Sequence, residues 1–367
     1  MKIQTRFAIS PTGYLHVGNI RTALLNYLTA KKLGGKFLLR IDDTDIKRSN
    51  QIFEDEIKKD LEWLGIEWDK IEKQSLRFER YREALENLKK ENRLYPCFET
   101  TNELDLKRKK LLNMGKPPVY DRSALKLTNE KIKILEREGR EPHWRFLLDH
   151  QKIKWNDKIL GTISVDLTSA SDPVFVKEDG QFLYTIASVC DDIDFEITHV
   201  LRGSDHVTNT ATQIQLLECM GSNLPIYGHH SLLTGLDGNN LSKRFGSLAL
   251  RDLRLSGIEP MALASMMSSL GTSKPIQIFH TYNDIIDNFQ LSSFSSTPTK
   301  FDPDLLYSIS TKVLHSTPLK GVENDLREIG VPEDKFATFW EMAKDNINKR
   351  EELLEIWNLC KNGPGSI

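Results

Sequence analysis

One short segment near the N-terminus constrains the fold of this chain most strongly. Residues 7–9 form a short apolar strand that ends in the tight turn Ser10-Pro11-Thr12-Gly13. The helix predicted after the turn has its apolar residues at helical spacing, namely Ile20, Ala23, Leu24, Tyr27 and Leu28. A helix that begins at the carboxyl end of a strand exposes backbone N–H groups and the positive end of its dipole. The segment therefore predicts an anion-binding site next to His16 and Gly18.

The common phosphate-binding motifs do not account for this segment. Gly13 and Gly18 have the spacing of a phosphate loop, but Asn19 stands where that loop needs lysine. The sequence contains no G-x-G-x-x-G motif for a dinucleotide. On spacing alone, a tight strand-to-helix turn with a packed His16 is as good an interpretation as an anion site.

A second segment, far along the chain, suits polyphosphate. Turn-forming residues 234–238 precede Asn239-Asn240-Leu241-Ser242-Lys243-Arg244, so we expect a loop there. Lysine offers a compact point charge and arginine a planar fork, and the two together could clamp phosphates. The alternative for this segment by itself is a solvated surface loop.

The two segments, in this order, resemble the two sequence motifs of the class I aminoacyl-tRNA synthetases. His16-Val17-Gly18-Asn19 is similar to the first motif and Leu241-Ser242-Lys243-Arg244 to the second. Four further stretches resemble the bacterial glutamyl-tRNA synthetase family, namely residues 6–13, 39–45, 184–188 and 200–203. The resemblance runs from about residue 3 to about residue 315 and is weaker beyond.

The resemblance implies a set of site residues. ATP, accompanied by Mg²⁺, would be bound by His16, Gly18, Asn19, Leu241, Ser242, Lys243 and Arg244, with His16 and Lys243 catalytic. Glutamate would be bound by Arg6, Ala8, Ser10, Asp42, Tyr184, Ser188 and Arg202, and the acceptor end of tRNA by Asp205. The family often has glutamate at the position of Asp42 and asparagine at that of Ser188, so we expect a slightly reshaped pocket.

The same residue types suit a substrate with two carboxylates and one ammonium. We expect Arg6 and Arg202 at the ends of strands, where each could form a bidentate pair with a carboxylate. Asp42 follows a strand and could receive the ammonium. Tyr184 and Ser188 lie on one turn of a predicted helix and could add hydroxyl contacts. Structural roles for these five residues are the alternative that spacing alone favours.

Other polar clusters have simpler explanations than metal binding. For the acidic runs 42–45 and 191–194 we expect turns and helix caps. We expect His229 and His230 to pack at a strand edge. Cys97 stands where some relatives bind zinc, but no second cysteine is near, so we predict no zinc.

The predicted fold is an α/β, doubly wound parallel sheet of Rossmann type. It is split by an insertion that, in the family, binds the acceptor end of tRNA, and mainly helical domains follow it. The expected domains are residues 1–93 and 184–250 (the two catalytic halves), 94–183 (the insertion), 251–320 (a stem-contact helical domain) and 321–367 (the start of an anticodon-binding region, apparently incomplete). We also expect a hairpin turn at Asn156-Asp157, a helix cap at Ser204 or Asp205, and a linker at residues 291–300.

Composition limits the remaining possibilities. The formal net charge of −2 argues against a general RNA-binding protein, so any tRNA surface must come from local clustering. The four scattered cysteines fit a reducing cytosol, and no apolar run suggests a signal peptide or a membrane span. We therefore expect a cytoplasmic monomer.

The leading hypothesis is ATP-dependent attachment of L-glutamate to tRNA-Glu, and perhaps tRNA-Gln, through a glutamyl-adenylate. One alternative is the truncated relative that glutamylates a modified base of tRNA-Asp. Another is a non-catalytic tRNA-binding paralogue, which should lack His16 or Lys243, whereas both are present.

Overall fold

The structure is a computed structural model that describes residues 2–239, 241 and 249–363. The chain divides into two compact units. Unit 1 contains Met1–Thr12, Lys36–Phe53 and Trp68–His229, and unit 2 contains Gly13–Gly35, Glu54–Glu67 and His230–Ile367. Each unit has its own sheet strands, helices and site residues, and each is described by itself below.

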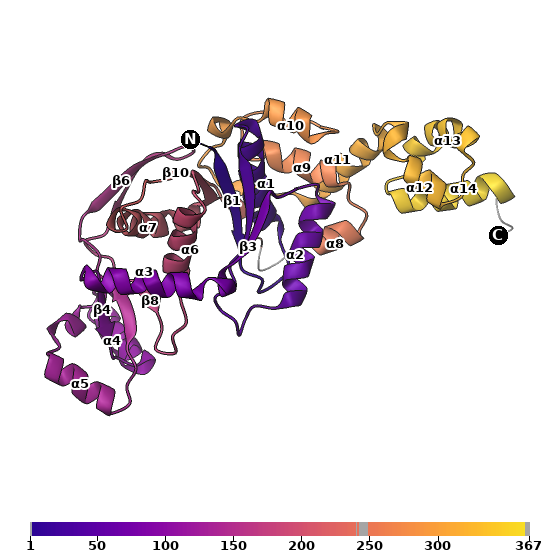
Figure 1. Ribbon diagram of the computed structural model, residues 1–367. Coiled ribbons are helices and arrows are strands. Elements are labelled where there is room, and N and C mark those ends of the chain that lie inside the picture. Colours follow the sequence, from indigo (N-terminus) through magenta and orange to yellow (C-terminus); the bar gives the residue numbers. More distant parts are fainter. Residues whose placement is uncertain (1, 240, 242–248, 364–367) are drawn as a thin grey trace. The chain divides into compact units, whose positions relative to one another are not determined.

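The centre of unit 1 is a parallel sheet (Figure 1). Its strands β1 (Gln4–Ile9), β2 (Lys36–Ile41) and β3 (Lys70–Lys73) pair in the order β1-β2-β3. Five of the six residues of β2 are buried, as is usual for a parallel strand covered on both faces. The register places Arg6 opposite Leu38 and Ala8 opposite Arg40, which fixes the site described below.

Two later strands extend this arrangement. The strand β9 (His199–Gly203) pairs with β10 (Ile226–His230). Thr198, just before β9, donates its backbone N–H to the carbonyl oxygen of Gln4 at 2.9 Å, so β9 lies beside β1. The neighbours therefore follow as β3-β2-β1-β9-β10, the order found in nucleotide-binding α/β folds.

The segment between β3 and β9 contributes antiparallel strands. The strands β4 (Leu94–Cys97), β5 (His143–Phe146) and β8 (Val174–Val176) form one sheet, and β6 (Lys152–Asp157) and β7 (Gly161–Asp166) form a hairpin. The predicted hairpin position is wrong, because Asn156 and Asp157 end β6 and the turn covers residues 158–160. Asp157 instead accepts hydrogen bonds from the N–H groups of Ile159 and Leu160, which shapes this turn.

The helices of unit 1 are α3 (Phe78–Lys90), α4 (Thr101–Asn113), α5 (Asn129–Arg137), α6 (Tyr184–Asp194) and α7 (Val207–Cys219). Of these, α3, α6 and α7 pack on an aromatic core. Phe146 and Phe175 stack with ring centroids 5.0 Å apart, and Tyr81 meets the edge of Phe182. Both pairs belong to one cluster that also contains apolar residues of α6 and α7.

Unit 2 is mainly helical, with one short parallel pair of strands. Its helices are α1 (Val17–Lys32), α2 (Gln51–Trp63, from Glu54 onward), α8 (Leu250–Leu255), α9 (Pro260–Ser269), α10 (Tyr282–Asn288), α11 (Pro303–His315), α12 (Glu323–Glu328), α13 (Phe336–Ala343) and α14 (Leu353–Asn362). A separate core around Trp340 and Trp357 joins the helices from α12 to α14, drawn in yellow in Figure 1.

Two further local predictions are wrong. Neither Ser204 nor Asp205 caps α7, because these residues form a short 3₁₀ turn and the residue before α7 is His206. The segment predicted as a linker is part of unit 2, since Phe294 is buried and β12 (Thr299–Lys300) pairs with β11 (Leu233–Thr234). No helix in the described part of the chain is long and apolar enough to cross a membrane.

Candidate active site

One face of the β1-β2 pair carries the charged residues of the site. Side chains alternate between the two faces of a strand, so Arg6 and Ala8 share a face of β1. Arg40, which pairs with Ala8, lies in β2, and Asp42 follows two residues later. Arg6, Arg40 and Asp42 are all buried, although Arg6 lies in the middle of β1 and not at its end as predicted.

The helix α6 supplies the opposing groups. Tyr184, Ser188 and Asp192 are spaced four residues apart and therefore lie along one side of α6. Tyr184 and Ser188 are one turn apart, as the sequence predicts. Ser188 and Asp192 are buried, and Tyr184 is partly exposed.

Arg40 joins the strand face to the helix. Its Nε and Nη2 donate to the two carboxylate oxygens of Asp42 at 2.7 and 3.1 Å. Its Nη2 also donates to Ser188 Oγ at 3.0 Å, and its Nη1 donates to the Ser188 carbonyl at 3.4 Å and to Asp192 Oδ1 at 2.8 Å. Burial alone would lower the pKa of Arg40, but Asp42 and Asp192 raise it well above its ordinary value. Arg40 therefore remains a cation.

Arg6 is held by the same carboxylate, that of Asp192. Its Nε and Nη2 donate to Asp192 Oδ1 and Oδ2 at 3.0 and 3.4 Å. Burial would raise the pKa of Asp192, but Arg6 and Arg40 outweigh it and lower that pKa. The Nη1 group of Arg6 has no hydrogen-bond partner among the described residues, so one edge of its guanidinium is available.

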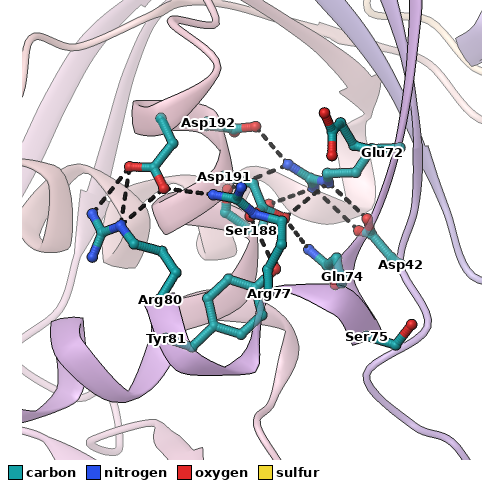
Figure 2. Close-up of polar contacts among 12 residues, drawn as sticks. Asp42, Glu72, Gln74, Ser75, Arg77, Arg80, Tyr81, Ser188, Asp191 and Asp192 are labelled. Atoms are coloured by element: carbon teal, nitrogen blue, oxygen red, sulfur yellow. Dashed lines mark hydrogen bonds and ion pairs between the residues drawn. The ribbon is translucent and has the colours of Figure 1, made fainter.

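The second acidic run is an ion-pair network and not a turn or cap, contrary to the prediction (Figure 2). Asp191 is fully buried and accepts hydrogen bonds from Gln74, Arg77 and Tyr81. Asp194 pairs with Arg77 and Arg80 at the partly exposed end of α6. Burial raises the pKa of Asp191.

The three aspartates of the first acidic run, residues 42–45, have different hydrogen-bond partners. Asp43 accepts from both the backbone N–H and the hydroxyl of Ser75 at 2.7 Å. Asp45 accepts from the N–H of Arg48 in the following turn, as expected. Asp42 is not part of a turn, because Arg40 pairs with both of its oxygens.

Arg202, at the end of β9, has only neutral hydrogen-bond partners in the described structure. Its Nη2 donates to Thr210 Oγ1 and Gln213 Oε1, each at 2.6 Å, and its Nη1 donates to the Tyr184 hydroxyl at 2.9 Å. Its Nε faces His229 Nε2 at 3.4 Å. These contacts use four of the five N–H groups of Arg202 and leave one N–H of Nη1 for a ligand. A bidentate pair with a carboxylate, as predicted, needs two N–H groups and does not fit this geometry. No described carboxylate lies within ion-pair distance of this buried guanidinium.

His229 and His230 pack in β10, the last strand of the order given above, as predicted, but His229 is also a buried centre of hydrogen bonding, which the prediction did not include. Its Nδ1 lies 2.5 Å from Asp157 Oδ2 and its Nε2 lies 2.8 Å from Thr210 Oγ1. Burial lowers the pKa of His229 despite the Asp157 contact, so the ring is neutral at pH 7. Burial opposes ionisation of Asp157, but hydrogen bonds from His229, Leu160 and Ile159 lower its pKa to about 2. The carboxylate therefore accepts a hydrogen bond from Nδ1–H, which keeps the ring proton on Nδ1, and the unprotonated Nε2 is an acceptor that faces Arg202.

The phosphate-binding candidates lie in unit 2. His16 caps α1. Its ring Nδ1 accepts a hydrogen bond from the backbone N–H of Gly18 at 3.1 Å, and its backbone N–H donates to Asn19 Oδ1 at 3.1 Å. Because Nδ1 is an acceptor, the neutral ring carries its proton on Nε2. A Cβ atom at Gly18 would lie 2.9 Å from His16 Cε1, which explains glycine at this position.

The second motif is described only at its borders. Ser242, Lys243 and Arg244 lie outside the described residues. Leu241 is half-buried, and Ala249 forms an antiparallel bridge with His16. Leu250 then donates its N–H to the Leu15 carbonyl at 2.7 Å. The segment that follows the second motif is thus anchored at the first.

The remaining predicted positions are exposed or uninvolved in the network. Ser10 and Asp205 are exposed, and Ala8 is partly exposed. No three His, Cys, Asp or Glu side chains of residues 2–239, 241 and 249–363 lie together as a possible metal site. Cys97 is buried, and burial raises its pKa to about 11. The absence of zinc remains a prediction.

Sequence reasoning missed Arg40 and Asp192 as site residues. A simple spacing signal identifies both of them. Arg40 lies two residues before Asp42 on the same strand face, and Asp192 lies four residues after Ser188 on the same helix side.

Comparison with known proteins places the chain in a class. A family model for the catalytic domain of class I tRNA synthetases (E and Q) matches residues 2–307, and the chain belongs to this family.

Individual relatives are described more specifically than the family model, as glutamate–tRNA ligases. The chain is 55% identical over 361 residues to "Glutamate--tRNA ligase 2" of Jannaschia sp. (strain CCS1), covering 98% of this chain and 80% of that protein. It is also 55% identical over 359 residues to the protein of that name from Ruegeria sp. (strain TM1040), covering 98% and 81%. The crystal structure of a glutamate tRNA ligase from Elizabethkingia meningosepticum in complex with its amino acid superposes with a TM-score of 0.87 at 29% identity, covering 98% of this chain and 80% of that one. The overall α/β fold is therefore that of these ligases.

Proposed function

We propose that this chain attaches L-glutamate to tRNA in an ATP-dependent reaction, with a glutamyl-adenylate as the intermediate. The proposal rests chiefly on relatives at 55% identity along 98% of the chain that are named glutamate–tRNA ligases. Neither a base-modifying relative nor a non-catalytic paralogue has such support.

The chemistry of the pocket in unit 1 supports a dicarboxylic substrate. A buried guanidinium without a nearby counter-charge is costly, because its charge loses solvation. Arg202 has no described carboxylate within ion-pair distance, although Asp192 acts on it over a longer range. A substrate carboxylate that contacts its free Nη1 N–H and the Tyr184 hydroxyl would supply a direct counter-charge. The amide of glutamine would not, so the site favours glutamate.

The other ligands of the amino acid follow from the same geometry. The free Nη1 edge of Arg6 is the second group that we assign to a substrate carboxylate. Each oxygen of Asp42 accepts only one hydrogen bond from Arg40 and has capacity for the substrate ammonium. We assign Ala8, Ser10 and Ser188 to the wall of this pocket.

The phosphate chemistry is assigned to unit 2. We propose that the Nε2 proton of His16 is donated to phosphate oxygens of ATP, and that Gly18, Asn19 and Leu241 line the nucleotide. Lys243, with Ser242 and Arg244, is assigned to the leaving pyrophosphate. The bridge between His16 and Ala249 supports this, since the six Cα-to-Cα steps from Lys243 to Ala249 span at most about 22 Å.

The reaction needs positioning and charge stabilisation more than covalent help. The glutamate α-carboxylate attacks the α-phosphorus in line, the bond to the pyrophosphate oxygen breaks, and pyrophosphate leaves with its negative charge. The terminal ribose hydroxyl of tRNA then attacks the activated carbonyl and releases AMP. Mg²⁺ would enter with ATP as part of the substrate, held mainly by phosphate oxygens and water.

The finer organisation remains part of the proposal. We propose a doubly wound sheet formed by residues 1–93 and 184–250, split by a tRNA acceptor-end insertion at 94–183 that is assisted by Asp205. Residues 251–320 would contact the tRNA stem, and residues 321–367 would begin an anticodon-binding region. We further propose that the protein is a monomer and that it charges tRNA-Glu. Whether it also charges tRNA-Gln is part of the test below.

The test is aminoacylation of separately purified tRNA isoacceptors with radiolabelled glutamate and ATP. We expect ATP-dependent charging of tRNA-Glu that is labile to mild base, as an ester to ribose should be. Label that withstands mild base and appears on tRNA-Asp would favour the base-modifying alternative and contradict the proposal.

A further inference from the structure

Four buried side chains of alternating charge form a continuous chain in unit 1. Arg6 pairs with Asp192 at 3.0 Å, Asp192 with Arg40 at 2.8 Å, and Arg40 with Asp42 at 2.7 Å. None of the four is more than 9% exposed. The two end members, Arg6 and Asp42, are the groups that we assign to opposite charges of the substrate.

The two central members hold their neighbours in the chain. The guanidinium of Arg40 has five N–H groups, and five hydrogen bonds to Asp42, Ser188 and Asp192 use all of them. Asp192 accepts from both arginines through one oxygen, Oδ1, while its Oδ2 accepts from Arg6. Arg40 therefore acts on other residues rather than on the ligand, and Asp192 holds both arginines through Oδ1.

We propose that Arg40 and Asp192 are positioning residues that fix the carboxylate-binding edge of Arg6 relative to the ammonium-binding oxygens of Asp42. A bidentate contact sets the plane of each end group, since both atoms of the fork must be satisfied at once. The shared Oδ1 atom connects the two contacts, so displacement of one guanidinium disturbs the other. The chain thereby holds a fixed separation between a positive and a negative group, matched to the opposite charges of an amino acid. This inference rests on the proposed function, and in particular on glutamate as the substrate.

The neighbouring residue Asp191 offers a matched control. It is as deeply buried as Asp192, lies on the same helix and is also ion-paired, with Arg77 at 2.7 Å. Asp191 also forms an ion pair with Arg40 at 3.7 Å, beyond hydrogen-bond distance, and no hydrogen bond or ion pair between described residues joins it to Arg6 or Asp42. Replacing either carboxylate by an amide removes one buried charge, but only Asp192→Asn breaks the chain.

The experiment compares Asp192→Asn and Asp191→Asn in the full chain. Steady-state charging of tRNA-Glu gives KM for glutamate and for ATP, and calorimetry gives the Kd for glutamate. We expect Asp192→Asn to raise both glutamate constants roughly 10- to 100-fold with the ATP KM within about twofold of wild type. Asp191→Asn should leave the glutamate constants within about threefold.

Equal glutamate constants for the two variants, or a parallel rise in the glutamate and ATP constants of Asp192→Asn, would overturn the inference. If Asp192→Asn does not fold, Arg40→Lys takes its place, because it keeps the charge but offers three N–H groups in place of five. A wild-type glutamate KM for that variant would also overturn the inference. Failure of the proposed function is a separate result, since the wild-type chain itself would then not charge tRNA with glutamate.

Discussion

His229 presents its unprotonated Nε2 to Arg202 at 3.4 Å, because its Nδ1 proton is held by Asp157 at 2.5 Å. The turn that follows Asp157 is thus connected, through one imidazole, to the arginine that we assign to a substrate carboxylate. An acceptor is required at Nε2, since a proton there would face the N–H of Arg202.

Asp157→Asn should disturb this arrangement. The amide would offer an N–H to Nδ1 and favour the tautomer with its proton on Nε2, directed at Arg202. We expect the glutamate KM to rise roughly 10-fold with the ATP KM nearly unchanged. Asp166→Asn, an exposed carboxylate at the end of β7 in the same hairpin, is the control and should behave as wild type. An unchanged glutamate KM for Asp157→Asn would mean that the tautomer does not matter.

Arg202→Gln tests the buried arginine that has no described carboxylate within ion-pair distance. A charge-assisted hydrogen bond contributes about 1.5–3 kcal/mol, so kcat/KM for glutamate should fall roughly 10- to 150-fold. Arg80→Gln removes a partly exposed arginine that pairs with Asp194 and should change kcat/KM little. Equal effects of the two substitutions, measured by tRNA charging at limiting glutamate, would contradict the assignment of Arg202.

Gly18→Ala should displace the imidazole of His16. The added Cβ would lie 2.9 Å from Cε1 of that ring, closer than normal contact allows. We expect glutamate-dependent ATP–pyrophosphate exchange, with tRNA present, to slow by roughly 10-fold or more while the fold is retained. Gly13→Ala is the matched control, because a Cβ there meets nothing within 4 Å. Equal exchange rates for both variants would argue against a phosphate contact by His16.

Lys243→Ala removes the cation assigned to the leaving pyrophosphate. Loss of one such group typically raises the barrier by about 2.7–4 kcal/mol, which slows the reaction roughly 100- to 1000-fold. Pyrophosphate exchange with glutamate and tRNA present measures this step. Lys274→Ala, an exposed lysine of unit 2, serves as the control. Wild-type exchange in Lys243→Ala would rule out its proposed role.

Stability should fall as the pH drops below 6.5, partly through His143 in β5. Burial, with the nearby Arg145 charge, lowers the pKa of His143 from 6.5 to about 4. The unfolded chain therefore binds a proton between pH 6.5 and pH 4 that the folded chain does not, so protonation favours unfolding there. Over the whole interval this amounts to about 3 kcal/mol.

Denaturant unfolding at pH 7 and pH 5 measures this loss. His143→Gln, which cannot take up the proton, should lose less stability between the two pH values than wild type does. An identical loss in both proteins would show that His143 does not contribute.

Elements that depend on local pattern were predictable from the sequence. The strand before the first turn, the helix after it and the proline that begins α9 all follow from apolar spacing and helix-start chemistry. The predicted position of the hairpin turn was wrong, because Asp157 ends the strand before the turn and its side chain accepts hydrogen bonds from the turn residues Ile159 and Leu160. Turn residues and strand ends share one composition, so local pattern does not separate them.

Several residues that gather at the candidate site were named from the sequence, but the network that joins them was not. Arg6, Asp42 and Ser188 were identified, yet their partners Arg40 and Asp192 are 34 and 186 residues from Arg6 along the chain, and the contacts depend on the register of β1 and β2 and on the face of α6. Long-range contacts of this kind follow from tertiary packing, which no local pattern encodes. The same reason explains why the His229 network was read as ordinary packing.

The most direct measurement is ATP-dependent charging of tRNA by the wild-type chain with glutamate and with glutamine, offered separately at equal concentration. The proposed glutamate site predicts charging with glutamate and none above background with glutamine, because Arg202 requires a negative group. Charging with glutamine, or no charging with either amino acid, would contradict it.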